Sequence, residues 1–130
     1  MLTVAAIMLL LVGAMHSLLG GKRLIAPILR REDLPVILGS VENTKITLWA
    51  GWHALTLFWW AQAAGLLTLA YAPEHFIPAI LGSTAIAAGI MGICAIILSK
   101  GRHKSWIFFL PLAFTTGYLA LEAIDIVAVN

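Results

Sequence analysis

Four runs of this chain contain no Asp, Glu, Lys or Arg, and they constrain its fold more than any other feature. They cover residues 2–19, 46–73, 76–98 and 105–121. About 20 residues of helix, at about 1.5 Å per residue, cross the roughly 30 Å hydrocarbon core of a bilayer. Backbone polar groups in lipid must bond to one another, which favours helices, and the alternating polarity of a transmembrane β-barrel is absent. The sequence therefore predicts an all-α membrane protein with transmembrane helices at about 2–20, 46–72, 76–98 and 105–127.

Composition supports this fold class. Apolar residues make up 62% of the chain and charged residues 11%, whereas a soluble domain carries about a quarter charged residues. No basic residue precedes the first apolar run, and Lys22 and Arg23 follow it, which is the reverse of a secretory signal. We therefore expect residues 1–130 to form one transmembrane domain that retains its first helix.

The basic residues predict the orientation of this domain. All of them lie in the segments that follow the first and third helices, and an up-down bundle places both segments on one side. The positive-inside rule assigns that side to the cytoplasm and the chain to the plasma (inner) membrane, with both termini external. The opposite side is acidic, with Glu74, Glu122 and Asp125. The basic residues are Lys22, Arg23, Arg30, Arg31, Lys45, Lys100, Arg102 and Lys104.

The inner connection between helices one and two has an amphipathic part. Leu24, Ile25, Ile28 and Leu29 recur at helical spacing among basic residues, which predicts a short interfacial segment in contact with anionic lipid at the cytoplasmic face. Docking on a partner protein is the alternative. Basic residues confined to loops beside apolar runs fit lipid headgroups, and we expect no nucleic-acid binding.

Two histidines lie inside the predicted membrane helices. His16 and His53 are both near the inner ends of their helices, and their depths differ by about 5 Å at helical rise. An imidazole in the membrane needs a partner. One hypothesis is that His16 and His53 ligate a haem iron or a transition metal, with His103 of the second inner connection as a further ligand.

Tryptophans surround His53 and leave two interpretations open. Trp49, Trp52 and Trp60 would form a flat aromatic wall beside a cofactor ring. Alternatively, they belong to the aromatic belt of the membrane interface, and the histidines hydrogen-bond the backbone or the Ser17 hydroxyl. The sequence has no HxxxH or CxxCH motif, which favours the second interpretation.

Helix four carries a polar stripe. Thr115, Tyr118, Glu122 and Asp125 are spaced three, four and three residues apart. If Glu122 faces the bundle interior, these carboxylates are candidates for proton or cation coupling. The alternative is that both acids mark the end of the helix in external water, which we favour.

Helix three carries a stripe of small residues. Gly82, Ala85, Gly89 and Gly92 fall on one face, which permits close helix approach in lipid. Helix three is therefore predicted to be central or to form an oligomer contact. Gln62 is a further polar position, to which the pattern assigns no role.

Motifs of soluble-type catalysis are absent. The chain has no GxSxG, HExxH, GxGxxG or Walker loop, so enzymatic activity is not indicated. The favoured hypothesis is a small non-enzymatic subunit or accessory protein that packs against a larger membrane complex or against itself. The alternatives are an electron-transfer protein that binds haem or a metal through His16 and His53, and a small oligomeric proton-coupled transporter that uses Glu122 and Asp125.

Overall fold

The computed structural model describes residues 1–129 and contains no β-strand within them. Four of its helices are long and apolar enough to cross a membrane, as the sequence predicts. These four candidate membrane spans are Leu2–Leu29, Val41–Tyr71, Pro73–Ser99 and Trp106–Ala128.

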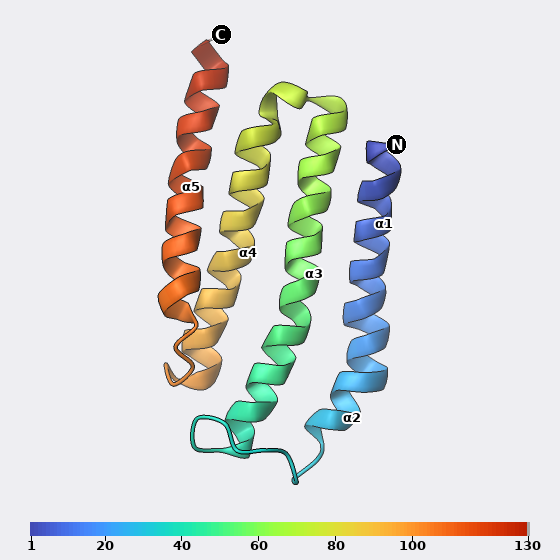
Figure 1. Cartoon of the computed structure of the whole chain (residues 1–130), viewed down its shortest axis with the longest axis vertical. Coiled ribbons are helices and arrows are strands. Elements are labelled where there is room, and N and C mark those ends of the chain that lie inside the picture. Colours follow the sequence, from blue (N-terminus) through green and yellow to red (C-terminus); the bar gives the residue numbers. More distant parts are fainter. Residues whose placement is uncertain (130) are drawn as a thin grey trace.

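The four spanning segments stand in one row in the order of the chain, alternately up and down (Figure 1). The α1 helix (Leu2–Met15) packs on α3 (Val41–Tyr71), α3 on α4 (Phe76–Ser99), and α4 on α5 (Trp106–Val129). In the described part of the chain, α1 and α5 each contact only one other spanning helix. The helices therefore have the predicted up-down order, and they form an open row, an arrangement that the sequence analysis did not specify.

The side chains of the two outer helices explain why the row stays open. Away from their single neighbours, α1 and α5 present bulky apolar groups, including Leu11, Phe108 and Phe114, the last of which is 78% exposed. Close helix packing in lipid uses small residues instead. The buried apolar residues are mostly alanines, and no large side chain of the described residues is fully buried. Both broad faces of the row are thus left for lipid or for another protein to cover.

The first helix is longer than predicted. After α1 it continues as a π-helical stretch, η1 (His16–Ile25), and then as α2 (Ala26–Leu29). Residues 24–29, which the sequence analysis assigned to a separate interfacial segment, are therefore the last turns of the first helix. The pair Gly20 and Gly21 suggests a helix end in the sequence, but here it lies inside the helix, where side chains of α3 pack on it.

The α3 helix begins at Val41, before the predicted position 46. Ser40 caps it, because its hydroxyl accepts a hydrogen bond of 3.1 Å from the Asn43 backbone N–H. The Asn43 side chain donates to the Leu38 carbonyl at 2.9 Å, and the buried Thr44 hydroxyl donates to the Pro35 carbonyl. These bonds fold the connecting segment back onto the first turn of α3.

Small residues line the contact between α4 and α5, as the glycine stripe predicts. A methyl group added at Gly92 would lie 2.5 Å from Leu110 Cδ2, so Leu110 would have to shift to admit any larger residue. Because α4 packs on both α3 and α5, the prediction that this helix is central is confirmed. The small residues that face each other are Gly82, Ala85 and Gly89 on α4 and Ala113, Gly117 and Ala120 on α5.

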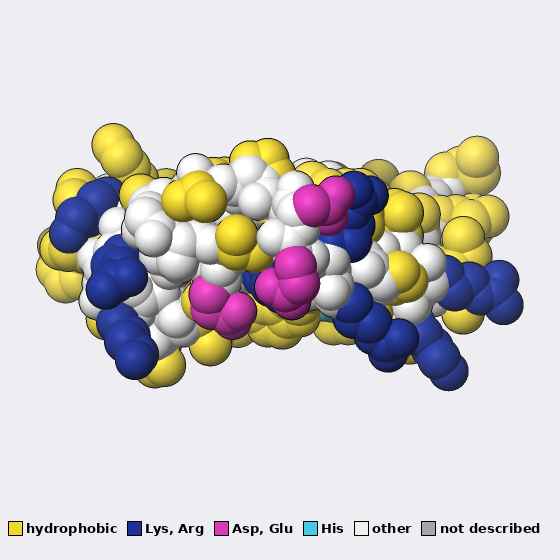
Figure 2. Space-filling view, turned by 90° about the horizontal axis from the view of Figure 1, so that it is seen from below, with side chains coloured by type: hydrophobic (Ala, Val, Ile, Leu, Met, Phe, Trp, Pro, Cys, Tyr) yellow, Lys and Arg dark blue, Asp and Glu magenta, His cyan; other side chains and the backbone are white. Residues whose placement is uncertain are grey.

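The two connections that carry the basic residues lie at the same end of the row, which we call the basic end. The chain termini are at the other end (Figure 1). Figure 2, viewed onto the basic end, shows Lys and Arg side chains in two groups with acidic side chains between them. Two ion pairs lie here: an exposed one between Arg31 and Asp33, and one between the largely buried Lys45 and the exposed Glu32.

Candidate functional site

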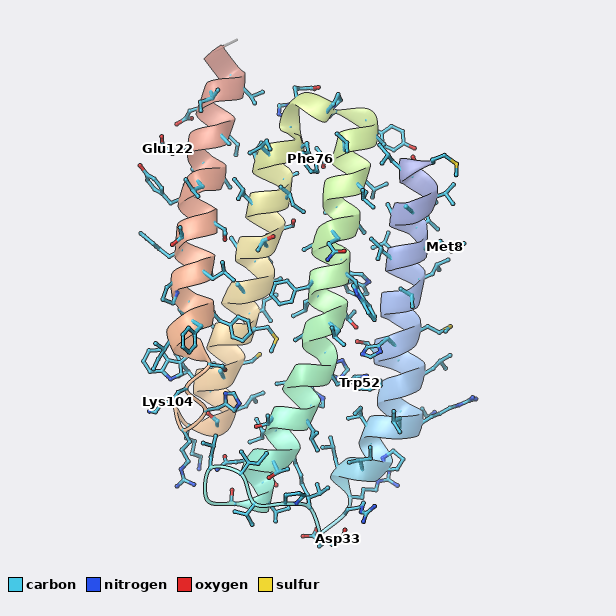
Figure 3. All side chains as sticks on the ribbon, viewed as in Figure 1. Met8, Asp33, Trp52, Phe76, Lys104 and Glu122 are labelled. Carbon is cyan, nitrogen blue, oxygen red and sulfur yellow. The ribbon has the colours of Figure 1, made fainter. Side chains whose placement is uncertain are left out.

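A group of polar and aromatic side chains fastens the first helix to α3 towards the basic end. We call it the His16–His53 cluster, and Figure 3 shows its Trp52 between the two helices. Most of its members are only partly buried, because the row has no second layer to cover them. The cluster consists of His16, Ser17, Trp49, Trp52, His53 and Thr56.

His16 and Trp52 make a reciprocal contact. Their rings are stacked with centroids 3.9 Å apart and an interplanar angle of 12°. His16 Nε2 lies 3.0 Å from the Trp52 carbonyl oxygen, and Trp52 Nε1 donates to the His16 carbonyl oxygen at 3.1 Å. A carbonyl oxygen only accepts hydrogen bonds, so Nε2 of His16 carries a proton and donates it. Trp59 makes a T-shaped contact with the same imidazole, with ring centroids 5.2 Å apart.

His53 lies at the end of a chain of hydroxyl groups. Its Nδ1 is 2.9 Å from Ser17 Oγ, which is 2.7 Å from Thr56 Oγ1. The buried Thr56 hydroxyl donates to the Gly13 carbonyl oxygen at 3.3 Å. Each hydroxyl has one proton, so Ser17 donates to Thr56 and accepts from His53 Nδ1. In neutral His53, Nε2 then holds the free electron pair.

Two glycines of the first helix make room for the indoles of α3. A methyl group at Gly13 would lie 2.6 Å from Trp60 Nε1, and one at Gly20 would lie 2.7 Å from Trp52 Cζ2. Trp60 uses this space to donate to the Leu10 carbonyl at 3.3 Å. The sequence analysis did not assign these glycines a role, although Gly13 and Gly20 are seven residues apart and lie on one face of the helix.

The structure brings His16 and His53 into one cluster but does not support a cofactor site there. His16 Nε2 is bonded to a carbonyl, and one face of its ring is covered by Trp52. Of the three predicted tryptophans, Trp52 and Trp60 hydrogen-bond the first helix, whereas Trp49 packs against His53 of its own helix, with ring centroids 4.9 Å apart. Among residues 1–129, no group of three or more His, Cys, Asp or Glu side chains is placed to hold a metal ion.

His103 lies apart from the other two histidines. It belongs to the turn between α4 and α5, where its Nδ1 is 2.8 Å from Ser105 Oγ. Together with Cys94 it lines a cavity of about 140 Å³ on the side of α3 that faces α4. The first helix contacts neither α4 nor α5, so His103 is not a third member of the His16–His53 cluster.

The polar stripe of α5 faces away from the rest of the chain. Thr115, Tyr118, Glu122 and Asp125 are all exposed, because the opposite face of α5 packs on α4. Figure 3 shows Glu122 level with Phe76, the first residue of α4, at the end of the row that carries the termini. This placement favours the interpretation that the acids mark the helix end, since no helix of the described chain encloses Glu122.

Gln62 is the polar residue whose position the sequence analysis left without a role. It lies nine residues before Tyr71, the last residue of α3, which places it about 14 Å inside that end at helical rise. Its side chain is exposed, and it has no hydrogen-bond partner within residues 1–129. Gln62 is thus an amide inside the spanning length of α3 that no other described residue satisfies.

Gln62 ends a regular stripe on α3. Leu48, Gly51, Leu55, Phe58 and Gln62 are spaced three, four, three and four residues apart, the spacing of one face of a coiled-coil helix. Leu48 and Leu55 are 38% and 49% exposed. Gly51 is also exposed and borders the cavity that His103 and Cys94 line, and a methyl group there would meet nothing within 4 Å. We call these five residues the α3 free face.

Comparison with known proteins gives no match to a protein-family model, to a curated protein or to a solved structure.

Proposed function

We propose that this chain is a non-enzymatic membrane subunit that assembles laterally, and that it pairs with a second copy through the α3 free face. The observation that carries this proposal is the unpaired Gln62 amide on an open face of a spanning helix. The basic end faces the cytoplasm by the positive-inside rule, where it contacts anionic lipid.

The physical reason is the cost of an unbonded amide in hydrocarbon. Transfer of such a group from water without a compensating hydrogen bond costs about 2–7 kcal/mol, depending on the reference state. Gln side chains in membrane helices commonly offset this cost by hydrogen-bonding across to another helix. Because no helix of the described residues hydrogen-bonds Gln62, we infer that its partner helix belongs to another molecule.

A second copy suits this face in three respects. Two copies in one membrane share the same orientation, so a twofold axis normal to the bilayer places Gln62 opposite Gln62 of the other copy at equal depth. An amide both donates and accepts, so the two side chains satisfy each other. The face has no charged residue, and Gly51 allows the two helices to approach closely.

The outer faces of the two end helices suit self-pairing less well. A contact between two α5 helices would bring Glu122 and Asp125 against their counterparts, and like charges repel. The outer face of α1 presents apolar side chains such as Met8 and Leu11 and offers no polar group for a specific contact. Among the faces compared within the described residues, the α3 free face is the one that combines a self-complementary polar group with a small residue.

The test is energy transfer between donor- and acceptor-labelled copies reconstituted in lipid vesicles over a range of protein-to-lipid ratios. We expect association that Gln62→Leu weakens by about 3- to 30-fold, since a hydrogen bond between membrane helices contributes about 0.6–2 kcal/mol. Tyr118→Phe, which removes a polar group from the exposed face of α5, is the matched control and should leave association unchanged. A monomer at every ratio, or association that Gln62→Leu does not weaken, would refute the proposal.

A further inference from the structure

Two adjoining cavities open at the basic end, among α2, α3 and the end of α4. The larger measures about 450 Å³ and is lined mainly by apolar side chains, with Leu29, Ile46, Trp49 and Leu98 among them. The smaller measures about 180 Å³ and includes Lys100 and Arg102. Glu42, Ile46 and Leu98 line both, so the two cavities form one groove that is apolar at one end and cationic at the other.

The basic groups at the cationic end of the groove are not neutralised by acidic side chains of the described residues. Within residues 1–129, neither Lys100 nor Arg102 forms an ion pair. Lys45 lies at the apolar end, where its side chain is only 18% exposed, and its ammonium pairs with the highly exposed Glu32 at 3.1 Å. Glu42 is the one acid that lines the groove. The groove therefore favours an anionic ligand over a cationic one.

The backbone holds this cationic end in a tight turn. Lys100 and Gly101 both have left-handed conformations, with φ of 51° and 75°, where α4 ends. The buried Ser99 hydroxyl bonds the Ala95 carbonyl and accepts from the His103 backbone N–H, which fixes the turn to the helix. Lys100 and Arg102 thus stand on a fixed turn beside the groove.

We propose that this groove binds one anionic phospholipid, with an acyl chain along Ile46, Trp49 and Leu98 and the phosphate between Lys100 and Arg102. The volume of the larger cavity lies within the range of about 300–1,000 Å³ that is usual for ligand sites. An arginine can hold phosphate oxygens with two hydrogen bonds, and lysine adds a point charge. An amphipathic groove at the boundary of the spanning helices matches a molecule with one apolar and one anionic end. The site is independent of the pairing of two copies through α3.

The test measures binding of phosphatidylglycerol and phosphatidylcholine to the purified full-length chain, by native mass spectrometry and by thermal stabilisation at physiological salt. We expect the wild-type chain to bind the anionic lipid more tightly. The double substitution Lys100→Gln and Arg102→Gln should weaken that binding by about 10- to 30-fold, since each removes a charge that would directly contact the phosphate, and one such charge contributes about fivefold. Leu98→Trp, which fills the groove where its two cavities meet, should weaken binding of the same lipid while both cations remain.

The matched control is the double substitution Lys22→Gln and Arg23→Gln, which removes the same charge from the exposed side of η1. It should change binding less than threefold, and circular dichroism should show unchanged helix content in all variants. Equal losses in the two double variants would mean general attraction to the basic end and would overturn the site. Stabilisation by inorganic phosphate as strong as that by the lipid would overturn the assignment of a lipid, because it would show that the apolar part of the groove contributes nothing.

Discussion

The imidazole of His16 lies parallel to the indole of Trp52, 3.9 Å away, and each residue hydrogen-bonds the backbone carbonyl of the other. Both bonds cross from the first helix to α3, so they offset the cost of placing two polar rings in a membrane. Helix packing in lipid has little hydrophobic driving force, and such contacts decide which helices associate. The contact is therefore best understood as the attachment of the first helix to the row.

The first prediction concerns the coupling between these two residues. We expect His16→Ala and Trp52→Ala each to lower the free energy of unfolding by about 1–3 kcal/mol, because each loses a stacking contact and interhelical hydrogen bonds. In a double-mutant cycle the two effects should be non-additive by about 1 kcal/mol or more. Unfolding in mixed micelles measures both quantities. His75→Ala, in the turn between α3 and α4 at the other end of the row, serves as the control, and additive effects of His16→Ala and Trp52→Ala would contradict the contact.

The second prediction concerns Gly20. A methyl group there would lie 2.7 Å from the Trp52 ring, so Gly20→Ala should displace the indole and destabilise the chain by about 1–3 kcal/mol. Gly51→Ala is a matched control in α3, because a methyl group there meets nothing within 4 Å. Alanine also favours a helix over glycine by about 1 kcal/mol, so Gly51→Ala should leave the monomer as stable as wild type or more so. Equal destabilisation by the two substitutions would argue against the Trp52 contact.

The sequence predicts the spans because lipid imposes a simple rule on them, namely length and absence of charge. It also predicts a central α4, because the stripe of small residues from Gly82 to Gly92 indicates that another helix packs closely against this face. It does not predict which faces of the other helices meet. In a span that is apolar on every side, hydrophobic periodicity does not distinguish the face that packs on protein from the face that contacts lipid, so an open row and a closed bundle look alike.

The His16–His53 cluster shows the same limit at the level of single residues. That His16 and His53 share a depth follows from counting residues, but their bonds to Trp52 and Ser17 depend on side-chain direction. His16 and Ser17 lie in the π-helical stretch that begins at His16, a rare conformation that the sequence analysis did not predict. Gly13 and Gly20 were the available clue, since only glycine admits an indole so close to a helix backbone.

The third prediction concerns the exposed ion pair at the basic end. Arg31 donates two hydrogen bonds to the Asp33 carboxylate, and chiefly for this reason the pKa of Asp33 falls from 3.8 to about 2. A carboxylate whose pKa is lowered in the folded state adds stability above about pH 4 and loses it as the pH falls towards 2. Because both side chains are exposed, the effect on stability is small.

We therefore expect the clearer result in a titration: Arg31→Gln should raise the Asp33 pKa towards 3.8, as followed by the carboxyl carbon in NMR. Lys45→Gln is the control, and it should leave the Asp33 pKa unchanged.

The fourth prediction tests the geometry of the proposed pair. Leu55 lies seven residues before Gln62 on the α3 free face, so in a parallel pair Leu55 of one copy lies near Leu55 of the other. In a chain with Cys94→Ala, which removes the native thiol, Leu55→Cys should form a disulfide between copies under mild oxidation in vesicles. Leu119→Cys, on the exposed face of α5, should cross-link far more slowly at the same protein-to-lipid ratio.

Adding Gln62→Leu should slow the Leu55→Cys cross-link by about the factor by which it weakens association, because the amide pair holds the two helices in register. If Leu119→Cys cross-links faster than Leu55→Cys, the copies associate through α5, and Gln62 is not the residue that joins them.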